Sequence, residues 1–204
     1  MAMIPDLENY FRGLVPHRAE LLRRLEAEAG QEHIPIVGPV VGELLFILAR
    51  VMGARRILEL GTATGYSAIY LAQAVAPDLG QVITLEINPA MARRAQDNIA
   101  SAGLSGQVEI KIGDARTLMA TLADSVDLIF MDIDKVGYLP ALPDCHRLLR
   151  PGGLLFVDNT GFEGAADFNQ ALLTDRRWRS VNLLSFLPEH SPEQDGLALA
   201  VKIA

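Results

Sequence analysis

The chain has a single cysteine, Cys145, among its 204 residues. One cysteine excludes a disulfide within the chain and any metal site built from several thiolates. Long apolar runs are missing as well. The longest, at residues 37–52, is interrupted by glycine, proline and charged side chains and is shorter than the ~20 apolar residues of a membrane-spanning helix. The first residues also lack the basic and then apolar stretches of a signal peptide. We therefore expect a cytoplasmic protein with no membrane partner.

Basic residues are in the minority, with 18 lysines and arginines against 25 aspartates and glutamates. The formal net charge of −7 disfavours non-specific attachment to the phosphate backbone of nucleic acids, although a local basic patch could still bind RNA. The length fits one domain, which we expect to span residues 1–204. Helices are predicted in residues 1–52, at 16–30 and 39–52, and a Rossmann-like core in residues 53–204.

Beyond residue 56, short apolar runs alternate with helix-like segments. Seven strands are predicted, at residues 57–60, 82–85, 108–112, 126–131, 154–157, 181–186 and 197–203. The best-marked helix is 89–102, because Asn88 can cap it, Pro89 suits its first turn and Gly103 can end it. Buried strands joined by helices form parallel sheets, whereas the last two strands are close enough to pair antiparallel. The pattern predicts a doubly wound, mostly parallel seven-stranded α/β sheet with an antiparallel C-terminal strand pair.

The ends of the first three predicted strands carry residues suited to a nucleotide. In such sheets, ligands bind outside the carboxyl ends of the strands. Gly61 and Gly65 follow the first strand, and their G-x-x-x-G spacing excludes both the dinucleotide fingerprint and, without a following G-K-[ST], the P-loop. Glu86 ends the second strand, where a carboxylate can accept two ribose hydroxyls, and Asp114 follows the third, where an acid can take an adenine amino group.

Oxygen ligands follow the next two strands. Asp132 comes directly after the fourth, and Asp158 and Asn159 come after the fifth. If these strands are neighbours, two carboxylates and an amide oxygen meet at one edge of the sheet. Such a site suits Mg²⁺, or another divalent cation such as Mn²⁺ or Ca²⁺, better than Zn²⁺. Lys135, three residues after Asp132, stands beside this set.

These segments resemble the cation-dependent O-methyltransferases, the family of the catechol and caffeoyl-CoA O-methyltransferases. Residues 58–68 look like the first cofactor motif of that family and residues 84–89 like its second. The resemblance implies an S-adenosylmethionine-dependent enzyme, with the nucleotide-binding roles of Glu86 and Asp114 extended to a larger set. The implied cofactor-binding residues are Val37, Glu59, Gly61, Ser67, Glu86, Asp114, Ala115 and Asp132. The implied metal ligands are Asp132, Asp158 and Asn159, and the implied catalytic residues are Lys135, as the base, and Asp132.

The acceptor is left open by the sequence. The segment after Asn159 is short, which favours a compact acceptor such as a catechol-like vicinal diol. Ala198, however, stands where the catechol enzyme has an acceptor-contacting glutamate, and Glu189, Glu193 or Asp195 could replace it. Two alternatives remain: methylation of 5-hydroxyuridine in tRNA, and a non-catalytic protein that binds S-adenosylmethionine. The apolar 39–52 helix predicts a homodimer. His190 lies in a loop that could border the acceptor and has no assigned role.

Overall fold

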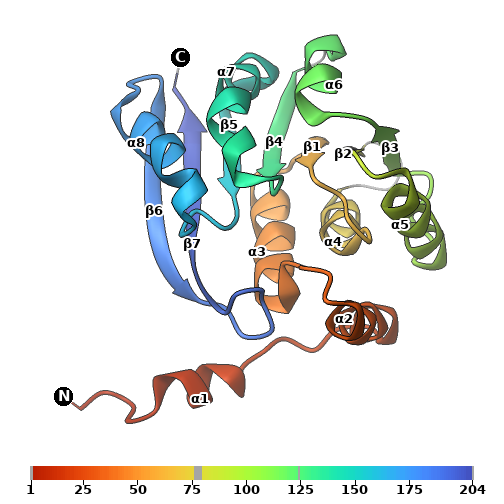
Figure 1. Cartoon of the computed structure of the whole chain (residues 1–204), viewed down its shortest axis with the longest axis vertical. Coiled ribbons are helices and arrows are strands. Elements are labelled where there is room, and N and C mark those ends of the chain that lie inside the picture. Colours follow the sequence, from red (N-terminus) through yellow and green to blue (C-terminus); the bar gives the residue numbers. More distant parts are fainter. Residues whose placement is uncertain (1, 76–79, 124, 204) are drawn as a thin grey trace.

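The computed structural model describes residues 2–75, 80–123 and 125–203, so the two end residues of the predicted 1–204 domain lie outside this description. A seven-stranded sheet runs through the molecule with helices on both faces (Figure 1). Its strands are β1 (Arg56–Leu60), β2 (Gln81–Glu86), β3 (Val108–Ile112), β4 (Val126–Met131), β5 (Leu149–Val157), β6 (Trp178–Phe186) and β7 (Gln194–Lys202). Two short 3₁₀ turns, η1 (Lys135–Gly137) and η2 (Glu163–Ala165), follow β4 and β5. The α-helices are α1 (Leu7–Arg12), α2 (Glu20–Glu32), α3 (Gly38–Val51), α4 (Tyr66–Ala74), α5 (Pro89–Ser101), α6 (Ala115–Thr121), α7 (Tyr138–Leu148) and α8 (Ala166–Thr174).

The order of the strands across the sheet is β3-β2-β1-β4-β5-β7-β6. Strands β1 to β5 are parallel, whereas β7 is antiparallel to both β5 and β6. The predicted doubly wound sheet with an antiparallel C-terminal pair is therefore confirmed. The chain turns back between β1 and β4, which are neighbours, and this switch point is where open α/β sheets bind ligands.

Alternate residues of the central strands pack into two hydrophobic clusters. In β4, Leu128 and Phe130 join one cluster with α3, α4 and α5, while Ile129 and Met131 join the other with α7 and α8. This alternation follows from the two-residue period of a strand, whose side chains point to opposite faces. Because helices cover both faces of the sheet, the sequences of the central strands are continuous apolar runs.

Several predicted boundaries differ from the structure; the helix predicted at 16–30 begins at Glu20, and the last two strands each begin three residues earlier than predicted. The second helix runs over α2 and continues past Gly30, and His33 ends it in the left-handed conformation with φ 57°. The fifth strand begins at Leu149 instead of residue 154, because Leu149 already pairs with Val126 before an irregularity in the register. By contrast, α5 starts after Asn88, whose side chain accepts the Ala90 N–H at 2.9 Å as predicted.

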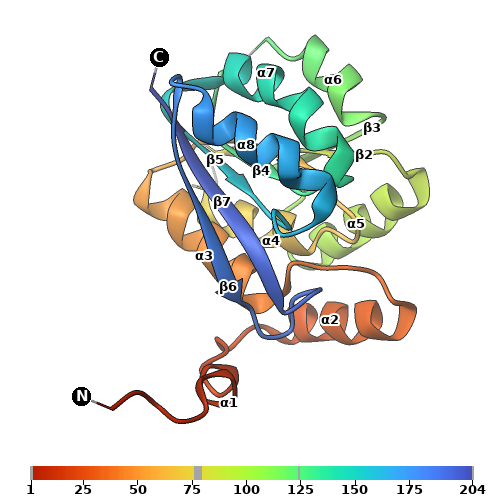
Figure 2. The same ribbon diagram turned by 60° about the vertical axis from the view of Figure 1, so that its left-hand side comes forward.

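The N-terminal helix α1 lies apart from the body in both views and buries none of its residues (Figures 1 and 2). Figure 2 also shows that the loop between β6 and β7 extends toward α1 and α2. Arg12 of α1 reaches that loop through a two-pronged ion pair with Glu193, with distances of 2.5 and 2.8 Å. Within the described ranges, none of the helices is long and apolar enough to cross a bilayer.

Candidate active site

A cavity of about 670 Å³ opens at the carboxyl ends of the parallel strands. Its wall is made by the turns that follow β1 to β5, by the segment before α3, and by the loop between β6 and β7. Most of the predicted site residues line it: Val37, Gly61, Ser67, Glu86, Asp114, Ala115, Asp132, Lys135, Asp158 and Asn159. Glu59 is the exception, because it is fully buried.

The turn after β1 passes very close to the end of β4. Gly61 has φ +96°, and a Cβ atom there would collide with the backbone carbonyl of Asp132. Only glycine fits such a conformation and approach. The backbone N–H of Asp132 in turn donates to the carbonyl of Leu60 at 2.9 Å. Gly61 therefore allows the turn after β1, which is predicted to bind the cofactor, to lie against Asp132, the first predicted metal ligand.

Glu59 carries a carboxylate into the interior behind this turn. Thr84 donates a hydrogen bond of 2.5 Å to its Oε2, while Oε1 has no partner among the described residues. Burial raises the pKa of Glu59 to about 7, and hydrogen bonds from Ser67 and Thr84 only partly oppose this. A positively charged group bound nearby would favour the ionised form of this carboxyl.

Glu86 closes the same turn from β2. Its Oε2 accepts the backbone N–H groups of Thr62 and Ala63 at 3.1 and 2.8 Å, and its Oε1 accepts that of Asn88 at 2.8 Å. A carboxylate has about four acceptor positions, so these bonds leave capacity for a ligand hydroxyl. Asp114, at the end of β3, uses Oδ1 to cap α6, and its hydrogen bonds from Thr117 lower its pKa.

The other end of the cavity holds Asp132, Lys135 and Asp158. Lys135 Nζ lies 3.1 Å from Asp132 Oδ1 and also donates to the carbonyl of Ile133 at 3.2 Å. Neighbouring β4 and β5 place Asp158 beside Asp132, and the backbone N–H of Asp158 donates to Met131. Burial and then the charge of Asp158 raise the pKa of Asp132 to about 6, although Lys135 acts to lower it.

Asp158 and Asn159 each have one side-chain atom held by a neighbour. Asn159 Nδ2 donates to Asp195 Oδ2 at 2.6 Å, which turns its amide oxygen away from that contact. Asp158 Oδ2 contacts His190, while the buried Asp158 Oδ1 has no partner among the described residues. Two neighbouring carboxylates, one of them with an unpaired buried oxygen, fit a hard divalent cation. A cluster of three or more histidine, cysteine, aspartate or glutamate side chains arranged for metal binding does not occur in the described ranges.

His190 had no assigned role from the sequence, and the structure places it in the cavity wall against Asp158. Its side chain is 1% exposed, and Nε2 lies 2.8 Å from Asp158 Oδ2. Nδ1 lies 2.6 Å from the carbonyl of Pro192. Burial lowers the pKa of His190, but the hydrogen bond and charge of Asp158 outweigh burial, so its pKa is raised.

Comparison with known proteins identifies the family of this chain. A family model described as O-methyltransferase matches residues 16–185. The chain belongs to the O-methyltransferase family. It is 38% identical to a catechol O-methyltransferase from Niastella koreensis over 86% of this chain and 85% of that protein. The predicted S-adenosylmethionine-dependent O-methyltransferase is thus confirmed as the enzyme class.

Two solved O-methyltransferases share the fold. One, from Streptomyces achromogenes and involved in tomaymycin synthesis, was solved with S-adenosylmethionine; it has a TM-score of 0.86 and 29% identity, covering 97% of this chain and 96% of that one. The other, from Bacillus cereus, was solved with S-adenosylhomocysteine; it has a TM-score of 0.85 and 27% identity, covering 96% of both chains.

The structure gives the surroundings of Ala198 and of the three acids that the sequence left open as replacements for a glutamate there. Ala198 is fully buried in β7 opposite Val157, so its side chain packs in the core. The three acids considered as replacements for a glutamate there are all engaged: Glu189 with Arg18, Glu193 with Arg12, and Asp195 with Asn159. Phe162, 44% exposed, instead lies beside Lys135, whose Nζ is 5.7 Å from the ring centre.

Proposed function

We propose that this O-methyltransferase uses a divalent cation, with Mg²⁺ the first choice, to methylate one hydroxyl of a small catechol-like vicinal diol. The observation that carries the proposal is the grouping of Asp132, Asp158 and Asn159 beside Lys135 at one end of the cavity. The cation ligands would be one oxygen from each of Asp132, Asp158 and Asn159. A cation at this place would favour the ionised form of an acceptor hydroxyl, whose pKa is otherwise near 10 for a phenol.

Residues of the protein would bind the methyl donor and accept the proton of the acceptor. Glu86 would hold the ribose of S-adenosylmethionine, Asp114 and Ala115 would lie at its adenine, and Val37, Gly61 and Ser67 would lie around its methionine part. Glu59, behind Ser67, supplies negative charge on that side. Lys135 Nζ, as the neutral amine, would take the proton of the acceptor hydroxyl and become the ammonium form. The new bond joins the acceptor oxygen to the methyl carbon, the bond from carbon to sulfur breaks, and its electron pair stays on sulfur as S-adenosylhomocysteine forms. Alignment of the three atoms contributes several kcal/mol.

A labelled-methyl assay tests this proposal. Catechols, hydroxycinnamoyl thioesters and bulk tRNA are offered in turn, each with Mg²⁺ and with EDTA. We expect methylation of catechols with Mg²⁺, and its loss with EDTA. Asp158→Ala should also abolish turnover while S-adenosylmethionine still binds, whereas Asp144→Asn, on α7 and outside the cavity lining, should not. Catechol methylation that persists in EDTA, or methylation of tRNA alone, would contradict the proposal.

We also propose that the chain works in the cytoplasm as a homodimer. Most of α3 packs within its own chain, but Ile47 and Val51 remain 50% and 81% exposed, and Leu184 of the edge strand β6 is 90% exposed. Exposed apolar side chains of this kind favour contact with a partner. Light scattering at micromolar concentration should give twice the mass of one chain, and a monomer would refute the dimer.

A further inference from the structure

Each of the three proposed metal ligands is contacted by a different side chain. Lys135 contacts one oxygen of Asp132, Asp195 accepts from the amide nitrogen of Asn159, and His190 contacts one oxygen of Asp158. Two of these three partners lie close together in the chain: His190 is in the loop between β6 and β7, and Asp195 is near the start of β7. Residues 190–195 therefore contribute no proposed ligand but contact two of the ligands.

The contact of His190 with Asp158 is specific in geometry. The carbonyl of Pro192 can only accept a hydrogen bond, so the Nδ1 that contacts it carries a hydrogen. The ring is thus held at both nitrogens: Nδ1–H donates to the carbonyl of Pro192, and in the doubly protonated ring Nε2–H donates to Asp158 Oδ2. Since both side chains are 1% exposed, water does not compete for this bond. The other oxygen, Oδ1, is left without a protein partner in the described ranges.

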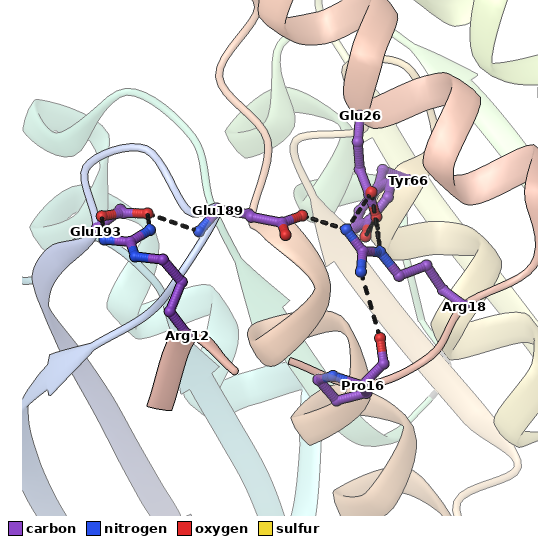
Figure 3. A network of polar contacts seen from close by, with 7 residues as sticks. All are labelled: Arg12, Pro16, Arg18, Glu26, Tyr66, Glu189 and Glu193. Atoms are coloured by element: carbon purple, nitrogen blue, oxygen red, sulfur yellow. Dashed lines mark hydrogen bonds and ion pairs between the residues drawn. The ribbon is translucent and has the colours of Figure 1, made fainter. Parts of the chain in front are cut away.

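The backbone that carries His190 is itself held in place. The carbonyl of Glu189 passes so close to Gly38, which has φ +68°, that a Cβ atom on Gly38 would lie 2.6 Å from it. Glu189 N–H donates to Glu193 Oε1 at 3.0 Å, and the side chain of Glu189 pairs with Arg18 (Figure 3). The segment thus meets the N-terminus of α3 directly and the stretch before α2 through an ion pair.

The same network reaches the methyl-donor end of the cavity. Arg18 also binds Glu26 of α2, with distances of 2.7 to 2.9 Å. Glu26 in turn accepts a hydrogen bond of 2.6 Å from the hydroxyl of Tyr66, which lines the cavity (Figure 3). The loop that carries His190 is therefore tied to α2 and α4 as well as to its own strands.

We propose that His190 is a positioning residue for the metal site: by holding Asp158 Oδ2, it directs Asp158 Oδ1 toward the cation. This inference rests on the proposed cation dependence. A carboxylate that can rotate must be ordered when a cation binds, and that ordering weakens binding. Partners that orient metal ligands in this way typically contribute about 10- to 100-fold in metal affinity.

Manganese binding measures this effect without any turnover. Mn²⁺ is titrated into the protein saturated with S-adenosylmethionine, and free Mn²⁺ is followed by electron paramagnetic resonance at one fixed pH. The variants are His190→Ala, His190→Gln and, as a matched control, His17→Ala at an exposed position before α2. Affinity for S-adenosylmethionine is measured for each by calorimetry, which reports whether the rest of the cavity is intact.

We expect His190→Ala to bind Mn²⁺ roughly 10- to 100-fold more weakly, with S-adenosylmethionine affinity unchanged. His190→Gln, whose amide nitrogen can reach the place of Nε2, should recover most of the loss, and His17→Ala should match the wild type. A purely structural role for His190 predicts no rescue by glutamine and a loss of S-adenosylmethionine binding, which would overturn the inference.

Two further outcomes separate this inference from the proposed function. Unchanged or tighter Mn²⁺ binding in both His190 variants would overturn the positioning role alone, since the wild type would still hold the cation. Failure of the wild type to bind Mn²⁺ would overturn the proposed cation dependence, and the role of His190 with it.

Discussion

At the scale of single residues, Glu59 is the clearest titrating group in the protein without bound ligands. Its ordinary pKa of 4.5 is raised to about 7 by burial, so the folded chain holds a proton that the unfolded chain releases between these values. The contribution of Glu59 to stability is therefore complete below pH 4.5 and is lost as the pH rises through 7.

We expect Glu59→Gln to gain about 2 kcal/mol in free energy of unfolding relative to the wild type between pH 5 and pH 8, because glutamine does not ionise. Urea unfolding of both proteins without methyl donor measures the gap at the two pH values. Glu109→Gln, at a 45% exposed side chain on β3, serves as the control and should show little change. If the difference in free energy of unfolding between Glu59→Gln and the wild type were the same at both pH values, burial would not raise the pKa of Glu59.

Lys135 gives a second prediction at this scale. Lys135→Met removes the proposed proton acceptor but keeps a similar apolar stem beside Phe162. We expect kcat to fall about 10²- to 10⁴-fold, with affinity for S-adenosylmethionine unchanged. Lys111→Met, on β3 and paired with Glu109, should retain full activity. The kcat of both variants is measured in steady-state assays. A fall in kcat of less than tenfold for Lys135→Met would rule out the role of Lys135 as the base.

The sequence was informative about site residues for a physical reason. Each predicted residue from Gly61 to Asn159 stands at or just after a strand end, and parallel strands bring their carboxyl ends to one edge. His190 and Asp195 could not be found in this way. His190 belongs to the loop between the antiparallel strands β6 and β7, and Asp195 lies near the start of β7, so their contacts with Asp158 and Asn159 exist only once this strand pair has joined the sheet beside β5.

At the scale of secondary-structure elements, two glycines in helices have opposite surroundings. Gly42 of α3 is buried against α4, where a Cβ atom would meet the ring of Tyr70 at 2.5 Å, whereas a Cβ atom on Gly30 of α2 would meet nothing within 4 Å. Alanine favours a helix over glycine by up to about 1 kcal/mol. Overpacking typically costs about 1–3 kcal/mol.

We therefore expect Gly42→Ala to destabilise the protein by about 1–2 kcal/mol and Gly30→Ala to stabilise it by up to about 1 kcal/mol. Chemical denaturation of the two variants at one pH gives both values. Equal stability of the two variants would show that α3 and α4 are not packed as closely as described.

The same elements explain which boundaries could be predicted. Asn88 and Pro89 mark a helix start by local hydrogen bonding and backbone preference, so α5 was located from sequence. Gly30 is a common signal for the end of a helix, yet α2 continues for two more residues to Glu32, whose side chain pairs with Arg94 of α5. Residues 150–153 contain a proline and two glycines, which are typical of a turn. In the structure they belong to β5, whose pairing with β4 begins at Leu149 and Val126.

At the scale of the whole molecule, one sheet carries both helical layers, and the N-terminal helices α2 and α3 pack toward the same cluster as α4. We propose that the chain is one domain and unfolds as one unit. Trp178, the only tryptophan, lies at the start of β6, so its fluorescence reports on the C-terminal strand pair, while far-ultraviolet circular dichroism reports on all helices. We expect coincident transitions in urea, and separate midpoints would indicate two units.

In the proposed mechanism, Asp132, Asp158 and Asn159 converge on one cation beside the methyl donor. The most direct measurement is anomalous diffraction from crystals grown with Mn²⁺ and S-adenosylhomocysteine. We expect one strong peak about 2–2.5 Å from an oxygen of each of the three side chains, near the sulfur of the bound product. A peak coordinated by other residues, or density for the product with no peak between Asp132 and Asp158, would contradict it.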